Sequence, residues 1–338
     1  MTVEKKKVLW ALYHLGEREV PFIRQFQEAG FEVIRNPLGR CYQEDELIAT
    51  LPGIFATVAG VEPYTERVFQ AARDLRVVAR YGVGYEMIDV EAATRHGVVI
   101  AMAFGTNHEA VADCTLALMA VLVRNIVANH LRMKGGGWRS GMCSGLWRST
   151  VGIIGLGRIG KAVARRCRGF EMEILAYDPV QDLEFARQHG VTFVSLEELL
   201  RRADIVTLHA PHTPVTENMI NRDTLALMKP TAFLINTARG GLVEEGALYE
   251  ALASGRLAGA GLDVFKVEPP VGSPLLKLDN VILSPHVAGS DLPTEVRVAN
   301  RCIDSIVALA RGENPGSEYL LNPEVLQAGG GDALERRS

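Results

Sequence analysis

The sequence predicts an α/β protein built from two doubly wound parallel-sheet domains. Its 338 residues exceed what one ordinary hydrophobic core accommodates, so two domains are expected. Short apolar runs alternate with amphipathic stretches up to residue 102, and the same alternation starts again at residue 151. Near-continuous apolar strands separated by helices indicate parallel sheets that are covered on both faces.

In the first half, strands are expected at 7–12, 31–36, 55–60, 75–81 and 97–102, and helices at 19–30, 45–51 and 65–74. One long helical pattern follows at 109–133. After it comes "KGGGWRSGMCSGLWRS", which combines turn-forming residues with the large apolar side chains of Trp138 and Trp147. This stretch predicts an ordered excursion rather than a disordered linker.

In the second half, six apolar runs predict strands: "TVGIIG", "EILAYD", "IVTLHA", "AFLINTA", "GAGLDVF" and "NVILSP". Helices are expected between them at "GKAVARRCRGF", "LEELLRRA" and "EEGALYEALASG". A last helix is expected over 292–312. Both halves therefore consist of βα units, and the second half is the more regular.

Charge and cysteine usage narrow the class of protein. The formal net charge of −4 gives no electrostatic reason to expect nucleic acid or an anionic membrane as a partner. No apolar run approaches the length of about 18 residues that a membrane span needs. The 5 cysteines are odd in number, widely spaced and never in a C-x-x-C pair, which favours free thiols in a reducing compartment. We therefore expect a cytoplasmic protein.

A Gly-x-Gly-x-x-Gly motif lies in residues 151–179, "VGIIGLGRIGKAVARRCRGFEMEILAYDP". It follows an apolar strand pattern and opens a helical one, which is the context that a dinucleotide site requires. Gly155 permits the tight turn, Gly157 lets the backbone approach a pyrophosphate, and Gly160 lets helix and strand pack closely. Asp178 ends the next strand, where its carboxylate can accept hydrogen bonds from both ribose hydroxyls. Because this carboxylate would repel a 2′-phosphate, the motif predicts NAD rather than NADP.

Three ionisable residues stand just beyond three later strands, in "INTARGGLVEEGAL", "GLDVFKVEPP" and "LSPHVAGS". They are Arg239, Glu268 and His286. A guanidinium can hold a carboxylate through two parallel hydrogen bonds, an imidazole can exchange a hydroxyl proton, and a carboxylate beside that imidazole fixes its tautomer. Each residue alone is more often structural, but three complementary groups at the ligand-binding edge of one sheet favour a catalytic set.

These segments resemble the D-isomer-specific 2-hydroxyacid dehydrogenase family over roughly residues 5–325. The resemblance includes "HAPHTPVTENMI", "NTARGGLVEEGAL", "PLLKLDNVILSPHVAG" and, in the first half, "ARYGVGYEMIDVEAA". The phosphoglycerate dehydrogenase-like branch is most similar, in a short form without a C-terminal regulatory domain. The resemblance implies an NAD-dependent oxidoreductase that transfers hydride between nicotinamide and a D-2-hydroxy acid or its 2-oxo acid.

The family architecture implies a Rossmann NAD-binding domain at residues 104–289, inserted into a flavodoxin-like substrate domain formed by residues 1–103 and 290–338. The substrate would lie in the cleft between them. Family members are usually dimers built on the NAD-binding domain, and the stretch holding Trp138 and Trp147 is where the partner would dock.

The resemblance also implies a role for individual residues. His286 would be the acid/base, Glu268 its partner, and Arg239 the anchor of the substrate carboxylate and carbonyl oxygen. Further substrate contacts would come from Val83, Gly84 and Asn107. The implied cofactor contacts are Gly155, Gly157, Arg158, Ile159, Gly160, Asp178, His209, Pro211, Thr216, Thr237, Ala238, Asp263, His286 and Gly289. Among these, Asp263 would lie near the nicotinamide carboxamide.

The chain departs from the family pattern at three places. Phe104 stands at the hinge, where it could reach the cleft or, as we expect, pack against the hinge. Ala59, Gly60 and Val61 stand where phosphoglycerate dehydrogenases tend to carry a phosphate-binding Arg. A phosphate needs cationic or N–H donors, and only Arg80 or Arg73 of neighbouring elements could supply one here. We therefore expect an unphosphorylated substrate such as hydroxypyruvate, glyoxylate or a larger 2-oxo acid. His212 replaces an apolar residue and its role is open.

Other readings of the sequence stay open or are disfavoured. His209 and His212 form an H-x-x-H pair without nearby acidic or cysteine ligands, so no metal site is expected. We expect solvent or hinge contacts for Glu109 and Asp113, and a solvated face for the charged cluster "RRCR". The same scaffold could oxidise another small anion, formate or phosphite, although Glu268 speaks against formate. An NADH-sensing corepressor-like protein is the alternative outside enzymes.

Overall fold

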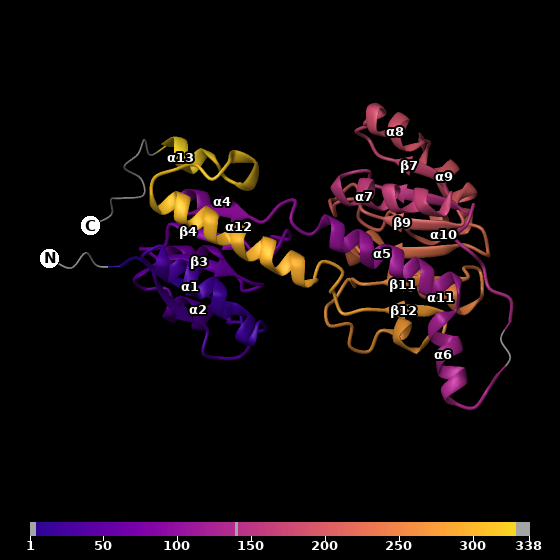
Figure 1. Ribbon diagram of the computed structural model, residues 1–338, viewed down its shortest axis with the longest axis horizontal. Helices are drawn as coiled ribbons and strands as arrows, with labels where there is room; N and C mark the ends of the chain where they lie inside the picture. The colour runs from indigo at the N-terminus through magenta and orange to yellow at the C-terminus, as the bar shows by residue number, and fades with distance from the viewer. Residues whose placement is uncertain (1–4, 139–140, 329–338) are drawn as a thin grey trace. The chain divides into compact units, whose positions relative to one another are not determined.

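The computed structural model describes residues 5–138 and 141–328, which form two compact units (Figure 1). Unit 1 spans Met1–Asn107 and Leu292–Ser338, and unit 2 spans His108–Asp291. Each unit has its own parallel sheet flanked by helices. The predicted fold class, two parallel-sheet α/β domains, is therefore confirmed.

The sheet of unit 1 has five parallel strands in the order β2-β1-β3-β4-β5. Their bounds are β1 Lys7–Trp10, β2 Glu32–Arg35, β3 Ile54–Ala59, β4 Val77–Arg80 and β5 Val99–Met102. This is the flavodoxin-like order. The order reverses between β1 and β3, and open sheets bind ligands at the carboxyl ends of the strands beside such a reversal.

Helices cover both faces of this sheet. One face packs on α1 and α12, through core residues such as Phe26 and Ile306, and the other packs on α2, α3 and α4, through residues such as Leu47 and Phe69. The helical bounds in unit 1 are η1 Gly16–Glu19, α1 Val20–Glu28, α2 Glu44–Thr50, α3 Glu66–Ala71, α4 Val90–Arg95, α12 Leu292–Ala310, η5 Ser317–Tyr319 and α13 Glu324–Ala328. The short helices α4 and α13 were not predicted. Phe104 packs against the second of these two cores, as expected.

A buried asparagine ties the C-terminal segment to the edge strand β5. The Asn322 Oδ1 accepts a hydrogen bond from the Ile100 N–H at 2.8 Å. Its Nδ2 donates to the Val98 carbonyl at 2.9 Å and to the Thr94 Oγ1 at 3.0 Å. Asn322 is fully buried, so its amide satisfies groups that water does not reach.

Replacing Asn322 by Leu should therefore lower the free energy of unfolding by about 1–3 kcal/mol, because the Ile100 N–H and the Val98 carbonyl lose a buried partner. Urea unfolding of the purified protein measures this change. Gln327→Ala, an exposed substitution on α13, is the matched control and should stay within about 0.5 kcal/mol of the parent. Equal stability of Asn322→Leu and the parent would contradict the structural role.

The sheet of unit 2 has seven parallel strands in the order β12-β11-β10-β9-β6-β7-β8. Their bounds are β6 Thr150–Ile154, β7 Glu173–Tyr177, β8 Val191–Phe193, β9 Ile205–Leu208, β10 Phe233–Asn236, β11 Gly259–Leu262 and β12 Val281–Leu283. The first six in chain order follow the Rossmann arrangement, and β12 extends one edge. The prediction of six strands was wrong by one, because β8 was missed.

The helices of unit 2 are α5 His108–Val123, α6 Ile126–Lys134, α7 Arg158–Cys167, η2 Arg168–Phe170, α8 Leu183–His189, α9 Leu196–Arg202, α10 Arg222–Leu227, η3 Gly240–Leu242, α11 Glu245–Ala253 and η4 Pro274–Lys277. The single helix predicted at 109–133 was wrong: α5 and α6 meet at a 58° bend, where Asn125 has a φ of 50°. Among the described residues no single helix is long and apolar enough to cross a membrane, and only the bent pair α5 and α6 meets these criteria together. Helices α8 and α10 were not predicted.

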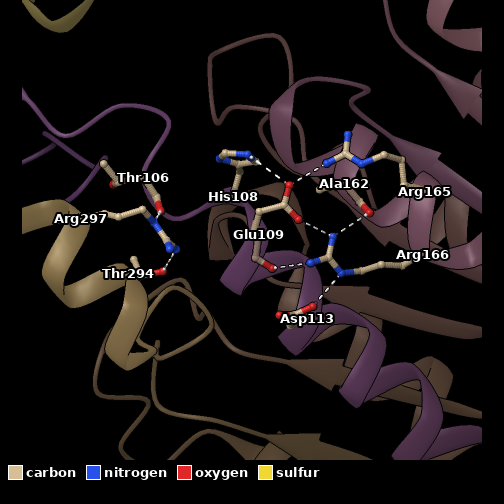
Figure 2. A network of polar contacts seen from close by, with 9 residues as sticks. All are labelled: Thr106, His108, Glu109, Asp113, Ala162, Arg165, Arg166, Thr294 and Arg297. Atoms are coloured by element: carbon tan, nitrogen blue, oxygen red, sulfur yellow. Dashed lines mark hydrogen bonds and ion pairs between the residues drawn. The ribbon is translucent and has the colours of Figure 1, made fainter.

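An ion-pair network fastens the start of α5 to α7 (Figure 2). Glu109 contacts the guanidinium groups of Arg165 and Arg166, each at 2.7 Å, and Asp113 contacts the Arg166 Nε at 2.7 Å. The Arg166 guanidinium lowers the pKa of Glu109. Asp113 is 66% exposed and Arg165 41%, so these side chains face solvent as predicted, and the ion pairs between the two helices were not predicted.

Candidate active site

Three neighbouring parallel strands of unit 2 end beside the candidate catalytic residues. Arg239 follows β10, Glu268 follows β11 and His286 follows β12. Since β10, β11 and β12 are adjacent and parallel, their carboxyl ends lie at one edge of the sheet. The structure thus brings all three residues to the same edge.

His286 and Glu268 are in direct contact. The His286 Nδ1 lies 2.7 Å from the Glu268 Oε2, and the Glu268 Oε1 accepts a hydrogen bond from the Phe265 N–H at 3.0 Å. An ionised carboxylate only accepts, so the imidazole Nδ1 carries the proton and Nε2 is left to exchange one. His286 has a φ of 54°, a strained conformation for a residue other than glycine. Its side chain is 52% exposed and can reach a small-molecule ligand.

A buried carboxylate holds the loop that carries His286. Asp263 is 1% exposed, and its two oxygens accept hydrogen bonds from the Ser284 Oγ at 2.6 Å, the Val287 N–H at 2.9 Å and the Ala288 N–H at 2.8 Å. The His286 N–H also donates to the Asp263 carbonyl at 2.8 Å. These bonds fix the strained backbone of His286. In this unit Asp263 is therefore a positioning residue, a function that the sequence did not indicate.

A second buried side chain shapes the turn of Arg239. The Asn236 Oδ1 accepts from the Ala238 N–H at 3.0 Å, and its Nδ2 donates to the Arg239 carbonyl at 2.9 Å. A Cβ on Gly240 would lie 2.0 Å from the carbonyl carbon of Phe265, so this turn packs directly against the turn that leads to Glu268. Only glycine permits that approach. Asn236 was missed by sequence reasoning, although its amide directly precedes the "TARGG" segment.

The glycine loop has the three features that a diphosphate site needs. Gly155 has a φ of 93°, and a Cβ there would lie 2.6 Å from the Ala210 nitrogen. A Cβ on Gly160 would lie 2.1 Å from the Gly155 carbonyl oxygen, so glycine is required for α7 to pack on β6. A Cβ on Gly157 would meet no described atom within 4 Å, so space is open on the side where a ligand would approach. Arg158 and Ile159 begin α7, whose first N–H groups have no partner within the helix.

Asp178 is oriented by this same loop. Its Oδ2 accepts from the Leu156 N–H at 2.7 Å, and its Oδ1 accepts from the Val180 N–H at 2.8 Å. The carboxylate therefore sits at the carboxyl end of β7, beside the open space at Gly157. A carboxylate in this place suits the ribose hydroxyls of a dinucleotide. Together with the helix N-terminus, the residues present fit NAD.

His209 lies at the carboxyl end of β9, and the backbone around its carbonyl abuts Gly155. Its Nε2 lies 3.0 Å from the Thr207 Oγ1, and its buried Nδ1 has no hydrogen-bond partner among the described residues. An orphaned nitrogen next to the glycine loop is consistent with a ligand nearby. In the following loop the Thr216 Oγ1 donates to the Pro211 carbonyl at 2.6 Å, which holds the turn closed.

The remaining predicted residues are distributed over both units. Thr237 is buried, and its Oγ1 lies 2.9 Å from the Thr115 Oγ1 of α5. Ala238 is 9% exposed, and Gly289 lies in the loop after His286. In unit 1, Val83 and Gly84 follow β4, and Asn107 is the last residue before unit 2.

His212 and His209 do not converge. The His212 ring lies against Gly241, where a Cβ would come within 2.5 Å of its Nε2, whereas the His209 ring contacts Thr207. Within the described residues, no group of three or more His, Cys, Asp and Glu side chains could hold a metal ion. His212 therefore packs on the turn that follows Arg239.

Burial lowers the pKa of His209 from 6.5 to about 3, so its ring stays neutral in the folded chain at mildly acidic pH. Below pH 6.5 the unfolded chain binds this proton and the folded chain does not. The free energy of unfolding therefore decreases as the pH is lowered from 6.5 to 3, by up to about 1.4 kcal/mol per pH unit. We expect His209→Gln, which keeps a polar group toward Thr207, to flatten this slope. Urea unfolding at several pH values between 7 and 5 tests this, and parallel slopes of parent and variant would contradict it.

Comparison with known proteins places the chain in a family. The family model for "D-isomer specific 2-hydroxyacid dehydrogenase, NAD binding domain" matches residues 116–288. A glyoxylate reductase of Korarchaeum cryptofilum (strain OPF8) is 44% identical over 273 residues, which cover 79% of this chain and 82% of that relative. A D-3-phosphoglycerate dehydrogenase of Archaeoglobus fulgidus is 40% identical over 303 residues, which cover 88% of this chain but only 56% of that longer relative.

A solved structure agrees with these relatives. D-lactate dehydrogenase from Aquifex aeolicus, complexed with NAD and lactic acid, has a TM-score of 0.82 and 26% identity, and the likeness covers 94% of this chain and 99% of that chain. The residues matched by the family model contain the complete sheet of unit 2, the glycine loop and the three candidate catalytic residues. With 44% identity to a relative covered over 82% of its length, the chain belongs to the D-isomer specific 2-hydroxyacid dehydrogenase family.

Proposed function

We propose that this NAD-dependent oxidoreductase reduces an unphosphorylated 2-oxo acid, of the glyoxylate or hydroxypyruvate type, to the D-2-hydroxy acid. The observation that carries the proposal is the His286–Glu268 contact of 2.7 Å at the strand edge that also holds Arg239 and the glycine loop. The reduced cofactor, NADH, would supply the hydride that joins substrate C2 and would leave as NAD+. The chain's own residues supply the proton and the orientation.

In this mechanism His286 is the acid/base. Its Nε2 donates a proton to the carbonyl oxygen of the 2-oxo acid during reduction and takes it back during oxidation. Glu268 holds Nδ1 and stabilises the imidazolium, and the hydrogen bond from the Phe265 N–H keeps this carboxylate oriented. The strained backbone of His286, held by Asp263, aims the ring.

Arg239 is the proposed anchor of the substrate. Its guanidinium would bind the substrate carboxylate through two parallel hydrogen bonds and would polarise the carbonyl group at C2. The Asn236 amide fixes the backbone from which Arg239 projects. Val83, Gly84 and Asn107 of unit 1 remain proposed substrate contacts, so unit 1 is proposed as the substrate domain.

Asp178 favours NAD over NADP, because its two oxygens are already oriented by N–H groups and would repel a 2′-phosphate. The remaining proposed contacts of the cofactor line the carboxyl ends of the strands of unit 2. They are Gly155, Gly157, Arg158, Ile159, Gly160, His209, Pro211, Thr216, Thr237, Ala238, Asp263, His286 and Gly289.

A spectrophotometric screen tests the proposed function. Loss of NADH absorbance should depend on an added 2-oxo acid, with NADH preferred to NADPH and with glyoxylate or hydroxypyruvate preferred to 3-phosphohydroxypyruvate. Oxidation of phosphite or formate should give no comparable NADH formation. No turnover of any 2-oxo acid would reject the function, and equal turnover of phosphorylated and unphosphorylated acids would reject the substrate class.

We further propose that the chain forms a homodimer through unit 2. Large apolar side chains are exposed along α6 and the segment after it: Ile126 at 53%, Leu131 at 62%, Met133 at 52%, Trp138 at 82% and Trp147 at 65%. So many large apolar side chains exposed on one helix and the segment after it favour an interface. A second copy of the chain is the proposed partner.

Leu131→Glu should convert the dimer to a monomer, because it places a charge among these exposed apolar side chains. Sedimentation velocity of the purified protein measures the change. Val215→Glu is the matched control, since Val215 is 91% exposed and lies on a different loop. A parent protein that already sediments as a monomer would contradict the proposed dimer.

A cytoplasmic location is proposed because all five cysteines are free thiols. Cell fractionation that recovers the protein from an oxidising compartment, with its cysteines paired, would contradict this location.

A further inference from the structure

Unit 1 contains a buried carboxyl group at the end of its sheet that the proposed mechanism does not use. Glu62 follows β3 and is 1% exposed. Neither of its carboxylate oxygens makes a well-formed hydrogen bond with the described residues, and only the backbone of Glu62 and Gly60 and the thiol of Cys41 interact with the group. A carboxyl group buried with such weak partners is costly to the fold, so its presence indicates a function.

Glu62 stands where the strand order of unit 1 reverses. A Cβ on Gly60 would lie 3.0 Å from the Glu62 Oε1 and 3.4 Å from the Leu12 Cδ2, so the loops after β1 and β3 meet at this point. This is the position at the carboxyl ends of an open parallel sheet where ligands bind. Glu62 is therefore placed next to a ligand-binding edge by the topology alone.

The neighbouring strand brings a cation to the same edge. Arg80 ends β4 and pairs in register with Ala59 of β3. Its Nη1 donates to the Tyr81 carbonyl and lies 3.0 Å from where a Cβ on Gly82 would be, directly before Val83 and Gly84. Burial raises the pKa of Glu62, and the nearby Arg80 charge offsets part of this effect. Arg80 thus lies next to the loop that is proposed to bind substrate, and Glu62 is close enough for the two charges to interact.

We propose that Glu62 is a specificity-determining residue, whose carboxyl group, when ionised beside Arg80, selects 2-oxo acids with an uncharged group beyond C2 and disfavours those ending in phosphate or carboxylate. The proposal rests on the proposed function. Charges interact more strongly across a buried, weakly screened region than in water, so Glu62 needs no direct contact with the substrate. It also reduces the attraction that Arg80 would exert on an anionic substrate.

The test compares Glu62→Gln, which is neutral and similar in size, with Glu62→Asp, which keeps the charge. Three substrates are used with NADH: glyoxylate, which has no group beyond C2, hydroxypyruvate and 3-phosphohydroxypyruvate. In Glu62→Gln, kcat/KM for 3-phosphohydroxypyruvate relative to hydroxypyruvate should rise about tenfold, mainly through KM, while kcat/KM for glyoxylate stays within about twofold. Glu62→Asp should keep the ratio of the parent.

Other results would overturn the inference. An unchanged ratio in Glu62→Gln, or an equal loss with all three substrates, would show that Glu62 has only a structural function. Glu62→Met provides a second neutral variant, and failure of both neutral variants to fold would lead to the same conclusion. A parent protein that reduces none of the three acids would instead reject the proposed function, and the inference with it.

Discussion

His286→Ala should lower kcat by about 10²- to 10⁴-fold while the Kd for NADH stays close to that of the parent. The variant removes the Nε2 that would donate the proton to the carbonyl oxygen, and it also leaves Glu268 without its partner. The glycine loop and Asp178 are untouched, so cofactor affinity should persist. Steady-state kinetics with a 2-oxo acid and a fluorescence titration with NADH measure the two quantities separately.

The matched control is His189→Ala, which removes a histidine of α8 whose ring contacts Phe185. Its kcat should remain within about twofold of the parent, because His189 takes no part in the proton transfer. If His286→Ala retained the parent kcat, the acid/base function would be wrong. If it lost NADH binding together with turnover, the loss of turnover would follow from the cofactor contact of His286, and the acid/base function would have no support.

Arg239→Ala should lower kcat/KM by about 10³-fold or more, with a higher KM and a lower kcat. The guanidinium would grip the carboxylate in the ground state and stabilise charge on the carbonyl oxygen in the transition state, so both constants change. Arg239→Lys should recover only part of the loss, because an ammonium cannot form two parallel hydrogen bonds. Kinetics across a range of 2-oxo acid concentrations separate the two constants.

Arg222→Ala serves as the control for this prediction. Arg222 is exposed on α10 and pairs with Glu250, so its removal should leave both constants unchanged. A rise in KM alone in Arg239→Ala would mean that Arg239 binds substrate and transition state equally, which contradicts its proposed contribution to the chemical step.

The two sheets could be predicted because their strands are nearly continuous apolar runs, as parallel strands buried on both faces must be. Strand β8 could not be predicted, because Val191–Phe193 is only three residues long and forms the edge of the sheet. The bend at Asn125 was hidden because apolar residues continue on both sides of it. Helix α10 did carry a usable signal, the Asn221 and Thr224 capping box, which sequence reasoning overlooked.

The candidate site followed from the rule that ligands bind beyond the carboxyl ends of parallel strands, which singled out Arg239, Glu268 and His286. The hydrogen bonds that hold these residues in place could not be predicted from the sequence by this rule. Asp263 binds a loop more than 20 residues away along the chain, and only the fold shows that its oxygens hold that loop. Glu62 became a candidate only when its burial was known, because an acidic residue after a strand is usually exposed.

Transfer of hydride to C2 with D stereochemistry is the central claim, and isotope labelling tests it directly. The protein is incubated with glyoxylate or hydroxypyruvate and NADH that is deuterated on both C4 positions, and the product is analysed by mass spectrometry and chiral chromatography. We expect one deuterium at C2 for each NADH oxidised, and the D isomer as the product from hydroxypyruvate. A product without deuterium at C2, or the L isomer, would contradict the proposed function.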